Sequence, residues 1–123
     1  MIEDRLTYLI RGAIFTVYNT LGPGLLENIY EAALIYELRE KGCKVESQVP
    51  VTVEYKGVVL NVDYRIDLLV EDKVIIELKS VNEMRDVYFK QLLTYLRITN
   101  KRVGVLVNFN TDDILSSIYR KVL

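Results

Sequence analysis

Two stretches near the N-terminus repeat apolar residues at helical spacing. The first, residues 4–20, predicts an amphipathic helix, which the glycines and proline of 21–24 (LGPG) bring to an end. The second predicts a helix from about 25 to 41, with Gly42 as the residue that terminates it. The apolar positions of the first helix are Leu6, Leu9, Ile10, Ala13, Ile14 and Val17. The chain is therefore expected to begin with two helices.

The period of the pattern then changes to two, which is typical of strands. Residues 49–55 alternate apolar with polar side chains, and a turn at 56–57 leads into a long second strand over 58–70. A second turn at 71–73 separates that strand from a third one over 74–79. We expect these three strands to form an antiparallel meander.

The rest of the chain returns to helix and then to strand. Helical spacing over 84–99 is followed by the continuous apolar run 103–109, which predicts a buried strand. Because a helix of crossover length separates 74–79 from 103–109, these two strands can lie parallel. A last helix, capped by Thr111 or Asp112, is predicted from the spacing of Ile114, Leu115, Ile118 and Val122.

The predicted order, α-α-β-β-β-α-β-α, describes an α/β protein with a mixed β-sheet flanked by helices. A chain of 123 residues suits one domain over residues 1–123. Half of the residues are apolar and 27% are charged, which is an ordinary balance for a globular protein. No apolar run approaches the roughly 18 residues of a membrane span, and the N-terminus lacks the pattern of a secretion signal. We therefore expect a cytoplasmic protein that does not contact a membrane.

Charge and the chemistry-bearing residue types narrow the function. The net charge of −1 gives no global attraction for nucleic acid, although residues 80–123 hold seven basic and four acidic side chains. The one cysteine, Cys43, excludes an internal disulfide and a cysteine-rich zinc site. The absence of histidine excludes His-ligated zinc and nucleophiles that histidine activates. Any catalysis must therefore use carboxylates, Lys, Arg, Tyr and a hard cation such as Mg²⁺ or Mn²⁺.

The hairpin predicted around the turn 71–73 carries charges in the middle of its strands. A three-residue loop there places Asp67 opposite Glu77 and Arg65 opposite Lys79. Since opposed residues share a face of the sheet, the two acids and Lys79 converge on one side. The other side is then filled by Leu68, Val70, Val74, Ile76 and Leu78. A two-residue loop would shift the register and break this convergence.

Two facing carboxylates repel each other, and burial raises the cost. A divalent cation between Asp67 and Glu77 removes the repulsion, and magnesium leaves room for a phosphate oxygen and a nucleophile. Lys79 beside such a cation would orient or deprotonate an attacking water, or neutralise developing charge. The alternative is an ion pair on a solvated face, Glu77 with Lys79 or Asp67 with Arg65, because such spacings also arise by chance.

This arrangement resembles the PD-(D/E)XK nuclease superfamily, whose restriction-endonuclease-like fold has an α-β-β-β-α-β core. Asp67 on the second strand and the segment Glu77-Leu78-Lys79 on the third match its Asp and its (D/E)-x-K. Ile66 stands where a proline often precedes the Asp. The resemblance implies a nuclease-like fold and leaves the activity open, because many such folds have other functions.

From about residue 13 to 110 the chain also resembles the small GxxExxY family. The motif matches Gly24, Glu27 and Tyr30 in the segment GLLENIY. Further similar segments are VEYKG, YRIDLLVEDKVIIELKS, QLLTYLR and VNFN. Tyr30 is interpreted as a packing residue of this motif.

Five further residues are candidates for the site. The resemblance implies that Glu27 completes the metal site, and Glu31 lies on the same helix face, although a solvated acid near the helix N-terminus is the alternative for both. Gln91 would lie near the site or be a satisfied core amide. Tyr95 would stack on a base or pack in the core. Arg65 would contact phosphate or pair with Glu77.

The sequence thus favours a metal-dependent nuclease that hydrolyses phosphodiester bonds in DNA or RNA. Asp67, Glu77 and Glu27 would hold Mg²⁺ or Mn²⁺, and Lys79 would act on the water. The alternative is a catalytically silent nuclease-like module that binds nucleic acid or a protein partner, which the near-neutral charge favours. A third interpretation is a structural domain whose charged cluster is an ion-pair network. A homodimer is compatible with so small a nuclease.

Overall fold

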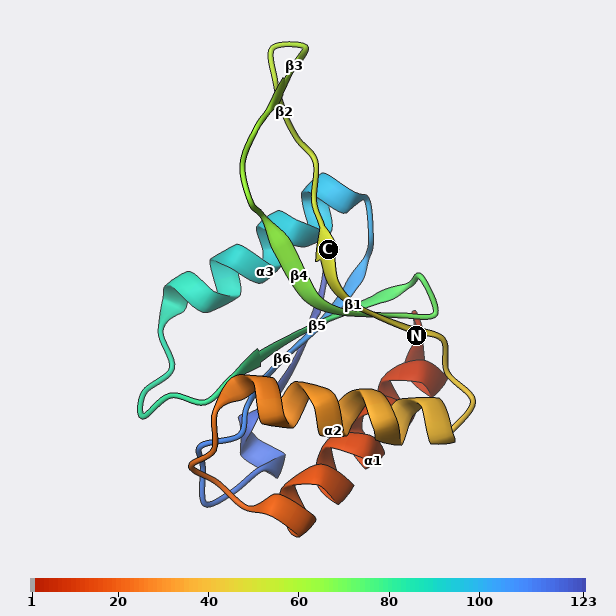
Figure 1. Ribbon diagram of the computed structural model, residues 1–123, viewed down its shortest axis with the longest axis vertical. Coiled ribbons are helices and arrows are strands. Elements are labelled where there is room, and N and C mark those ends of the chain that lie inside the picture. The colour runs from red at the N-terminus through yellow and green to blue at the C-terminus, as the bar shows by residue number, and fades with distance from the viewer. Residues whose placement is uncertain (1) are drawn as a thin grey trace.

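The computed structural model describes residues 2–123 and is shown in Figure 1. Three helices, seven strands and one 3₁₀ turn follow one another along this part of the chain. In order they are α1 (Asp4–Leu21), α2 (Glu27–Glu40), β1 (Val45–Pro50), β2 (Val53–Tyr55), β3 (Val58–Leu60), β4 (Arg65–Val70), β5 (Val74–Lys79), α3 (Asp86–Thr99), β6 (Val103–Asn108), η1 (Leu115–Ser117) and β7 (Ile118–Val122).

Five of the strands form one mixed sheet in the order β1-β4-β5-β6-β7. Every neighbouring pair is antiparallel except β5 and β6, which lie parallel and are joined by α3. The parallel pairing predicted for the strands on either side of α3 is therefore confirmed. The close approach of α3 to β6 depends on Gly104, where a Cβ atom would lie 2.7 Å from Cδ1 of Leu92.

The helices cover the sheet from both sides (Figure 1). The larger apolar cluster joins α1 and α2 to one face of the sheet, and the smaller one joins α3 to the other face. The five residues predicted to share one face of the hairpin, Leu68, Val70, Val74, Ile76 and Leu78, all belong to the larger cluster. The architecture is thus three layers, with the sheet between two helical layers.

The two strands predicted over 49–55 and 58–70 are each divided. Strand β1 starts at Val45, four residues before the predicted start, and belongs with β4 to the main sheet, whereas β2 and β3 form a separate two-stranded hairpin that projects from the sheet (Figure 1). The alternating pattern continues through both predicted strands. Residues of β2 and β3 nevertheless lie beyond the main sheet, and they pair only with each other. A hydrogen bond from the Val51 amide to the Tyr64 carbonyl, 2.7 Å long, closes the base of the hairpin.

The predicted C-terminal helix is wrong. Residues 115–117 form a single 3₁₀ turn, and 118–122 form strand β7, antiparallel to β6. Thr111 does accept a hydrogen bond from the amide of Asp113, so it caps a short turn instead of a helix. The strand forms because β6, a fully buried strand, would otherwise leave one edge of its backbone without hydrogen bonds.

In the described part of the chain, α1 is the longest helix, and neither it nor any other helix is both long and apolar enough to span a bilayer.

Candidate functional site

The antiparallel strands β4 and β5 separate at the two acids. Backbone pairing runs from Val70–Val74 to Leu68–Ile76, in the register predicted from a three-residue loop, and stops there. At the next position, Asp67 and Glu77, hydrogen bonds to side chains replace those between the backbones. The amide of Asp67 donates to Oε1 of Glu77 at 3.2 Å, and the amide of Leu78 donates to Oδ2 of Asp67 at 2.8 Å. The predicted meeting of Asp67 and Glu77 is therefore present, with carboxylates in place of backbone carbonyls.

The backbone around Asp67 is also irregular on its other edge. In β1, Ser47 pairs with Leu68 and Val49 pairs with Ile66, so Gln48 is the unpaired residue opposite Asp67. Gln48 has φ of 50°, a left-handed conformation that interrupts the regular strand, although the register on either side of it is unchanged. Ile66 packs into the cluster under α3, although alternation with Leu68 would place it on the other face. Asp67 therefore lies at a break in the regular pleat.

Burial and mutual repulsion raise the affinity of the acid pair for protons. Glu77 is 7% exposed. Its burial, followed by the charge of Asp67, raises the pKa of Glu77 to about 9, although Lys79 and the Asp67 amide act in the opposite direction. The two side chains also share a hydrogen bond. At neutral pH the pair therefore holds a proton where an unpaired carboxylate would hold none.

Lys79 ends β5 on the same side as Glu77, two residues further along the strand. The positive charge of Lys79 opposes the rise in the pKa of Glu77. Its Nζ lies 4.4 Å from the centre of the Tyr88 ring. The structure therefore brings together the three residues of the motif, Asp67, Glu77 and Lys79. Tyr88, which contacts the lysine through its ring, was not singled out from the sequence.

The N-terminal half of α2 forms the wall opposite Asp67. A pocket of about 200 Å³ is lined by Glu27, Asn28, Glu31, Gln48, Asp67 and Leu78. Glu31 accepts a hydrogen bond of 2.8 Å from Gln48. Burial raises the pKa of Glu31; the Gln48 hydrogen bond opposes this, and the charges of Asp67 and Glu27 add to it. Glu31 is thus coupled to Asp67, whereas Glu27, the favoured candidate, lies exposed on the rim.

Tyr30 positions this wall. Its ring is fully buried and stacks on Phe109, with 4.3 Å between the ring centres. Its hydroxyl donates to the carbonyl of Gly22 at 2.6 Å and accepts from the amide of Leu25 at 3.1 Å. The hydroxyl of Ser80, which follows Lys79, donates to the Leu25 carbonyl at 2.6 Å. Tyr30 is therefore a packing residue, as predicted, and it holds the loop that leads into Glu27.

Replacing Tyr30 by phenylalanine is expected to destabilise the protein by about 1 to 3 kcal/mol. The ring and its stacking remain, but the partly buried carbonyl of Gly22 and the amide of Leu25 lose their partner. Urea unfolding followed by circular dichroism measures the change. The control is Tyr8→Phe, because Tyr8 is 75% exposed. Equal stability of the Tyr30→Phe variant and the wild type would contradict this role.

The three predicted substrate-binding residues form a chain of contacts beside the acids. Nε2 of Gln91 donates to the Tyr95 hydroxyl at 3.3 Å, and that hydroxyl donates to the Arg65 carbonyl at 2.9 Å. Burial, followed by the charge of Glu77, raises the pKa of Tyr95. The Tyr95 ring is 3% exposed and lies against Tyr64, so it offers no face to a base. It supports the start of β4 instead.

Arg65 does not face Lys79 as predicted, because β4 and β5 are no longer paired at this level. Arg65 pairs with Pro50 of β1 instead. Its side chain is exposed and forms an ion pair with Asp63, with 2.7 Å between Nε and Oδ1. The alternative partners expected for Arg65, Glu77 and Asp67, are therefore wrong, because its ion pair in the described structure is with Asp63.

The chemistry of the acid pair fits a hard divalent cation. Asp67 and Glu77 come from neighbouring strands, touch each other, and retain a proton that a cation would displace. Between residues 2 and 123, however, no three carboxylate or thiol groups are arranged closely enough to hold one ion together. Two possible ligands, Asp67 and Glu77, are adjacent, and the acids of α2, Glu27 and Glu31, lie on the other side of the pocket.

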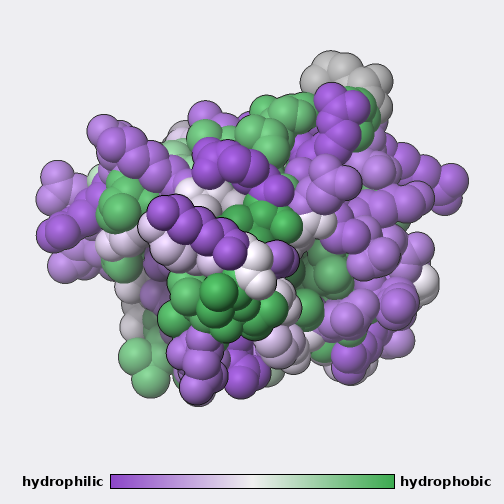
Figure 2. All heavy atoms as spheres, turned by 90° about the horizontal axis from the view of Figure 1, so that it is seen from above, coloured by the Kyte–Doolittle hydropathy of each residue, from purple (hydrophilic) through white to green (hydrophobic). Residues whose placement is uncertain are grey.

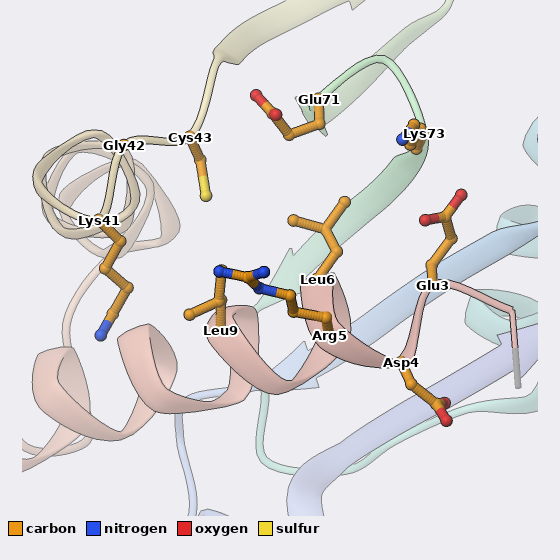
Figure 3. Close-up of a pocket in the computed structure, with 10 residues that line it drawn as sticks. All are labelled: Glu3, Asp4, Arg5, Leu6, Leu9, Lys41, Gly42, Cys43, Glu71 and Lys73. Atoms are coloured by element: carbon orange, nitrogen blue, oxygen red, sulfur yellow. The ribbon is translucent and has the colours of Figure 1, made fainter.

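A larger pocket lies elsewhere. It measures about 480 Å³ and is formed by the N-terminal end of α1, the C-terminal end of α2 and the turn between β4 and β5 (Figure 3). Figure 3 shows the Cys43 sulfur directed into it, with acidic and basic side chains around the rim. Lys41 of this pocket and Glu27 of the other stand at opposite ends of α2, about 20 Å apart by helix rise. The acid pair and this pocket are therefore separate features.

The three-layer arrangement, with an Asp on β4 and Glu-x-Lys on β5, defines an α/β protein with a restriction-endonuclease-like fold. The family comparison agrees with this class. A family model described as the PD-(D/E)XK nuclease superfamily matches residues 4–121, and the chain belongs to this superfamily.

A solved structure has a related fold. The chain is similar to the crystal structure of SSO0001, with a TM-score of 0.56 and 22% sequence identity. The match covers 98% of this chain and 58% of the other, so this chain spans a little more than half of that protein's length. At this identity the likeness shows the fold alone. No curated protein matches the chain.

Proposed function

We propose that the protein is a metal-dependent nuclease that hydrolyses phosphodiester bonds in DNA or RNA. The observation that carries the proposal is the contact of Asp67 with Glu77 at the point where β4 and β5 separate, with Lys79 beside them. Membership of the superfamily supports the same class of function. Within the superfamily, the motif Gly24, Glu27 and Tyr30 favours the GxxExxY family. We also propose one domain over residues 1–123, because the family model covers residues 4–121.

Each residue has a distinct part in this proposal. Asp67 and Glu77 would hold Mg²⁺ or Mn²⁺, with Glu27 or Glu31 joining them from across the pocket. The bound cation supplies positive charge for the phosphate and lowers the pKa of a water. Lys79, held over the Tyr88 ring, would orient that water or donate to the oxygen that becomes charged. Gln91 and Tyr95 support Arg65, which would contact a phosphate.

A silent nuclease-like module that binds nucleic acid or protein is the second candidate. Its support is that, within residues 2–123, no acid of α2 joins Asp67 and Glu77 in a three-residue metal-binding group, together with the net charge of −1. In such a module the proton shared by Asp67 and Glu77 would relieve the repulsion between the two carboxylates in place of a cation. The two candidates differ in whether the acid pair takes up a divalent ion.

Titration with Mn²⁺ by calorimetry at pH 7.5 tests the difference, because it needs no substrate. The wild type is expected to bind one ion with release of a proton, since the Asp67–Glu77 pair is protonated at that pH. Asp67→Asn is expected to lose the binding, because the amide supplies no negative charge. Asp63→Asn serves as the control, since Asp63 is an exposed acid two residues before the same strand.

A wild type that takes up no Mn²⁺ would move the proposal to the silent module. Binding that survives in Asp67→Asn would place the ion elsewhere and would contradict the assignment of the site. Glu27→Gln and Glu31→Gln, measured in the same way, identify which acid of α2 contributes.

A further inference from the structure

The β2–β3 hairpin gathers several exposed apolar side chains. Five of its residues within eight positions are large, apolar and 39–64% exposed, namely Tyr55, Val58, Val59, Leu60 and Val62. The hairpin projects from the main sheet in Figure 1. Figure 2 looks onto this end of the molecule and shows an apolar patch surrounded by polar side chains. A contiguous patch of this kind marks an interaction surface.

The two edges of the hairpin differ. β2 carries Glu54 and is followed by Lys56, and charges of this kind protect an edge from pairing. β3 is Val-Val-Leu and carries none. Apart from β2, no strand pairs with β3 within residues 2–123, so the outer edge of β3 has no strand partner. A hairpin of two short strands is marginal in water, and further strands stabilise it.

We infer that β3 pairs with β3 of a second copy of this chain and joins the two molecules in a homodimer. Run antiparallel about Val59, the strand is self-complementary, since Val58 meets Leu60 and Val59 meets itself. The result is a four-stranded sheet, β2-β3-β3-β2, with a twofold axis at Val59 and its charged β2 edges outermost. No charge of β3 is buried in the process.

The charges of the hairpin favour a protein partner over nucleic acid. Between Val53 and Tyr64 there is one basic residue, Lys56, against two acidic ones, Glu54 and Asp63. A phosphate backbone requires an excess of cations. A second copy requires an apolar strand with a free edge, which is what β3 supplies. The inference rests on the hairpin alone and does not depend on the proposed nuclease activity.

Disulfide trapping tests the register of this interface. Directly opposed residues of antiparallel strands have Cα atoms about 4.5–5.5 Å apart, within the range that a disulfide spans. Val59→Cys is therefore expected to form a covalent dimer under mild oxidation. Val87→Cys is the matched control, because Val87 is 58% exposed and lies on α3. Native Cys43 interferes little, since it is 8% exposed, and burial and then Glu71 raise the pKa of its thiol.

Sedimentation velocity tests the association without a cross-link. A strand-sized interface is smaller than the roughly 800 Å² per partner of a stable complex, so the dimer should dissociate on dilution. We expect the wild type to shift from dimer to monomer over a dilution of about a hundredfold. Val59→Asp places two like charges directly opposite each other and should be monomeric throughout. Val87→Asp should behave as the wild type does.

The inference is overturned if Val59→Cys forms no more covalent dimer than Val87→Cys. It is equally overturned by a dimer that Val59→Asp does not weaken, because another surface then joins the copies. A wild type that stays monomeric at every concentration, with a Val59→Asp variant that loses affinity for nucleic acid, would assign the hairpin to nucleic acid instead.

Discussion

Replacing Glu77 by glutamine is expected to stabilise the metal-free protein at pH 8. The folded protein holds a proton on Glu77 up to about pH 9, whereas the unfolded chain releases it near the ordinary value of 4.5. Between these two values the unfolded state binds fewer protons, so the free energy of unfolding falls as the pH rises. From pH 5 to pH 8 the fall amounts to at most about 4 kcal/mol, at about 1.4 kcal/mol per pH unit. Glutamine removes this dependence and can still donate to Asp67.

Urea unfolding of both proteins at pH 5 and pH 8, in the presence of a chelator, measures this effect. The wild type should lose stability at pH 8, and Glu77→Gln should lose much less. Glu54→Gln, a change of an exposed acid on the hairpin, should follow the wild type. Mn²⁺ added at pH 8 should restore stability to the wild type, because the cation replaces the proton. A Glu77→Gln variant that is less stable than the wild type at pH 8 would contradict the direction of the pKa shift.

Much of the sheet could be predicted from the sequence, because its pattern is local. The turn at 71–73 and the alternation on either side of it fix the register of β4 and β5. The failure at the C-terminus has a physical cause. Ile118 and Val122 are four residues apart, which suits one face of a helix, and they also lie on alternate positions of a strand. The free edge of β6, a feature of the tertiary structure, decides between them.

The acids of the site could be predicted from the sequence, whereas the contacts that surround them could not. Counting from the turn brings Asp67 opposite Glu77, but it cannot show that their carboxylates replace the backbone bonds there. The role of Glu31 depends on Gln48, a residue 17 positions away whose left-handed backbone no local pattern predicts. Tyr95 suits both a stacking residue and a core residue by pattern, and only the packing of α3 on the sheet buries it. Contacts between distant segments account for each of these differences.

Removing the Lys79 amine should reduce cleavage by about a hundredfold to ten-thousandfold, the range that one proton-transfer or charge-stabilising group supplies. We expect this role because Lys79 is the last residue of the strand that carries Glu77, and its Nζ is held 4.4 Å from the centre of the Tyr88 ring. The assay uses Lys79→Ala with Mn²⁺ on supercoiled plasmid, single-stranded DNA and single-stranded RNA. Lys90→Ala is the matched control, because Lys90 is exposed on α3.

Mn²⁺ calorimetry on Lys79→Ala separates catalysis from assembly of the site. Lys79 opposes the rise in the pKa of Glu77, so its loss should leave Mn²⁺ affinity unchanged or slightly increased while turnover falls. A variant that cleaves as fast as the wild type would reduce Lys79 to an ion-pair partner of Glu77. A variant that loses both the metal and the activity would give the lysine a structural part in holding the pair together. Only the loss of turnover with the metal retained assigns the chemistry to the amine.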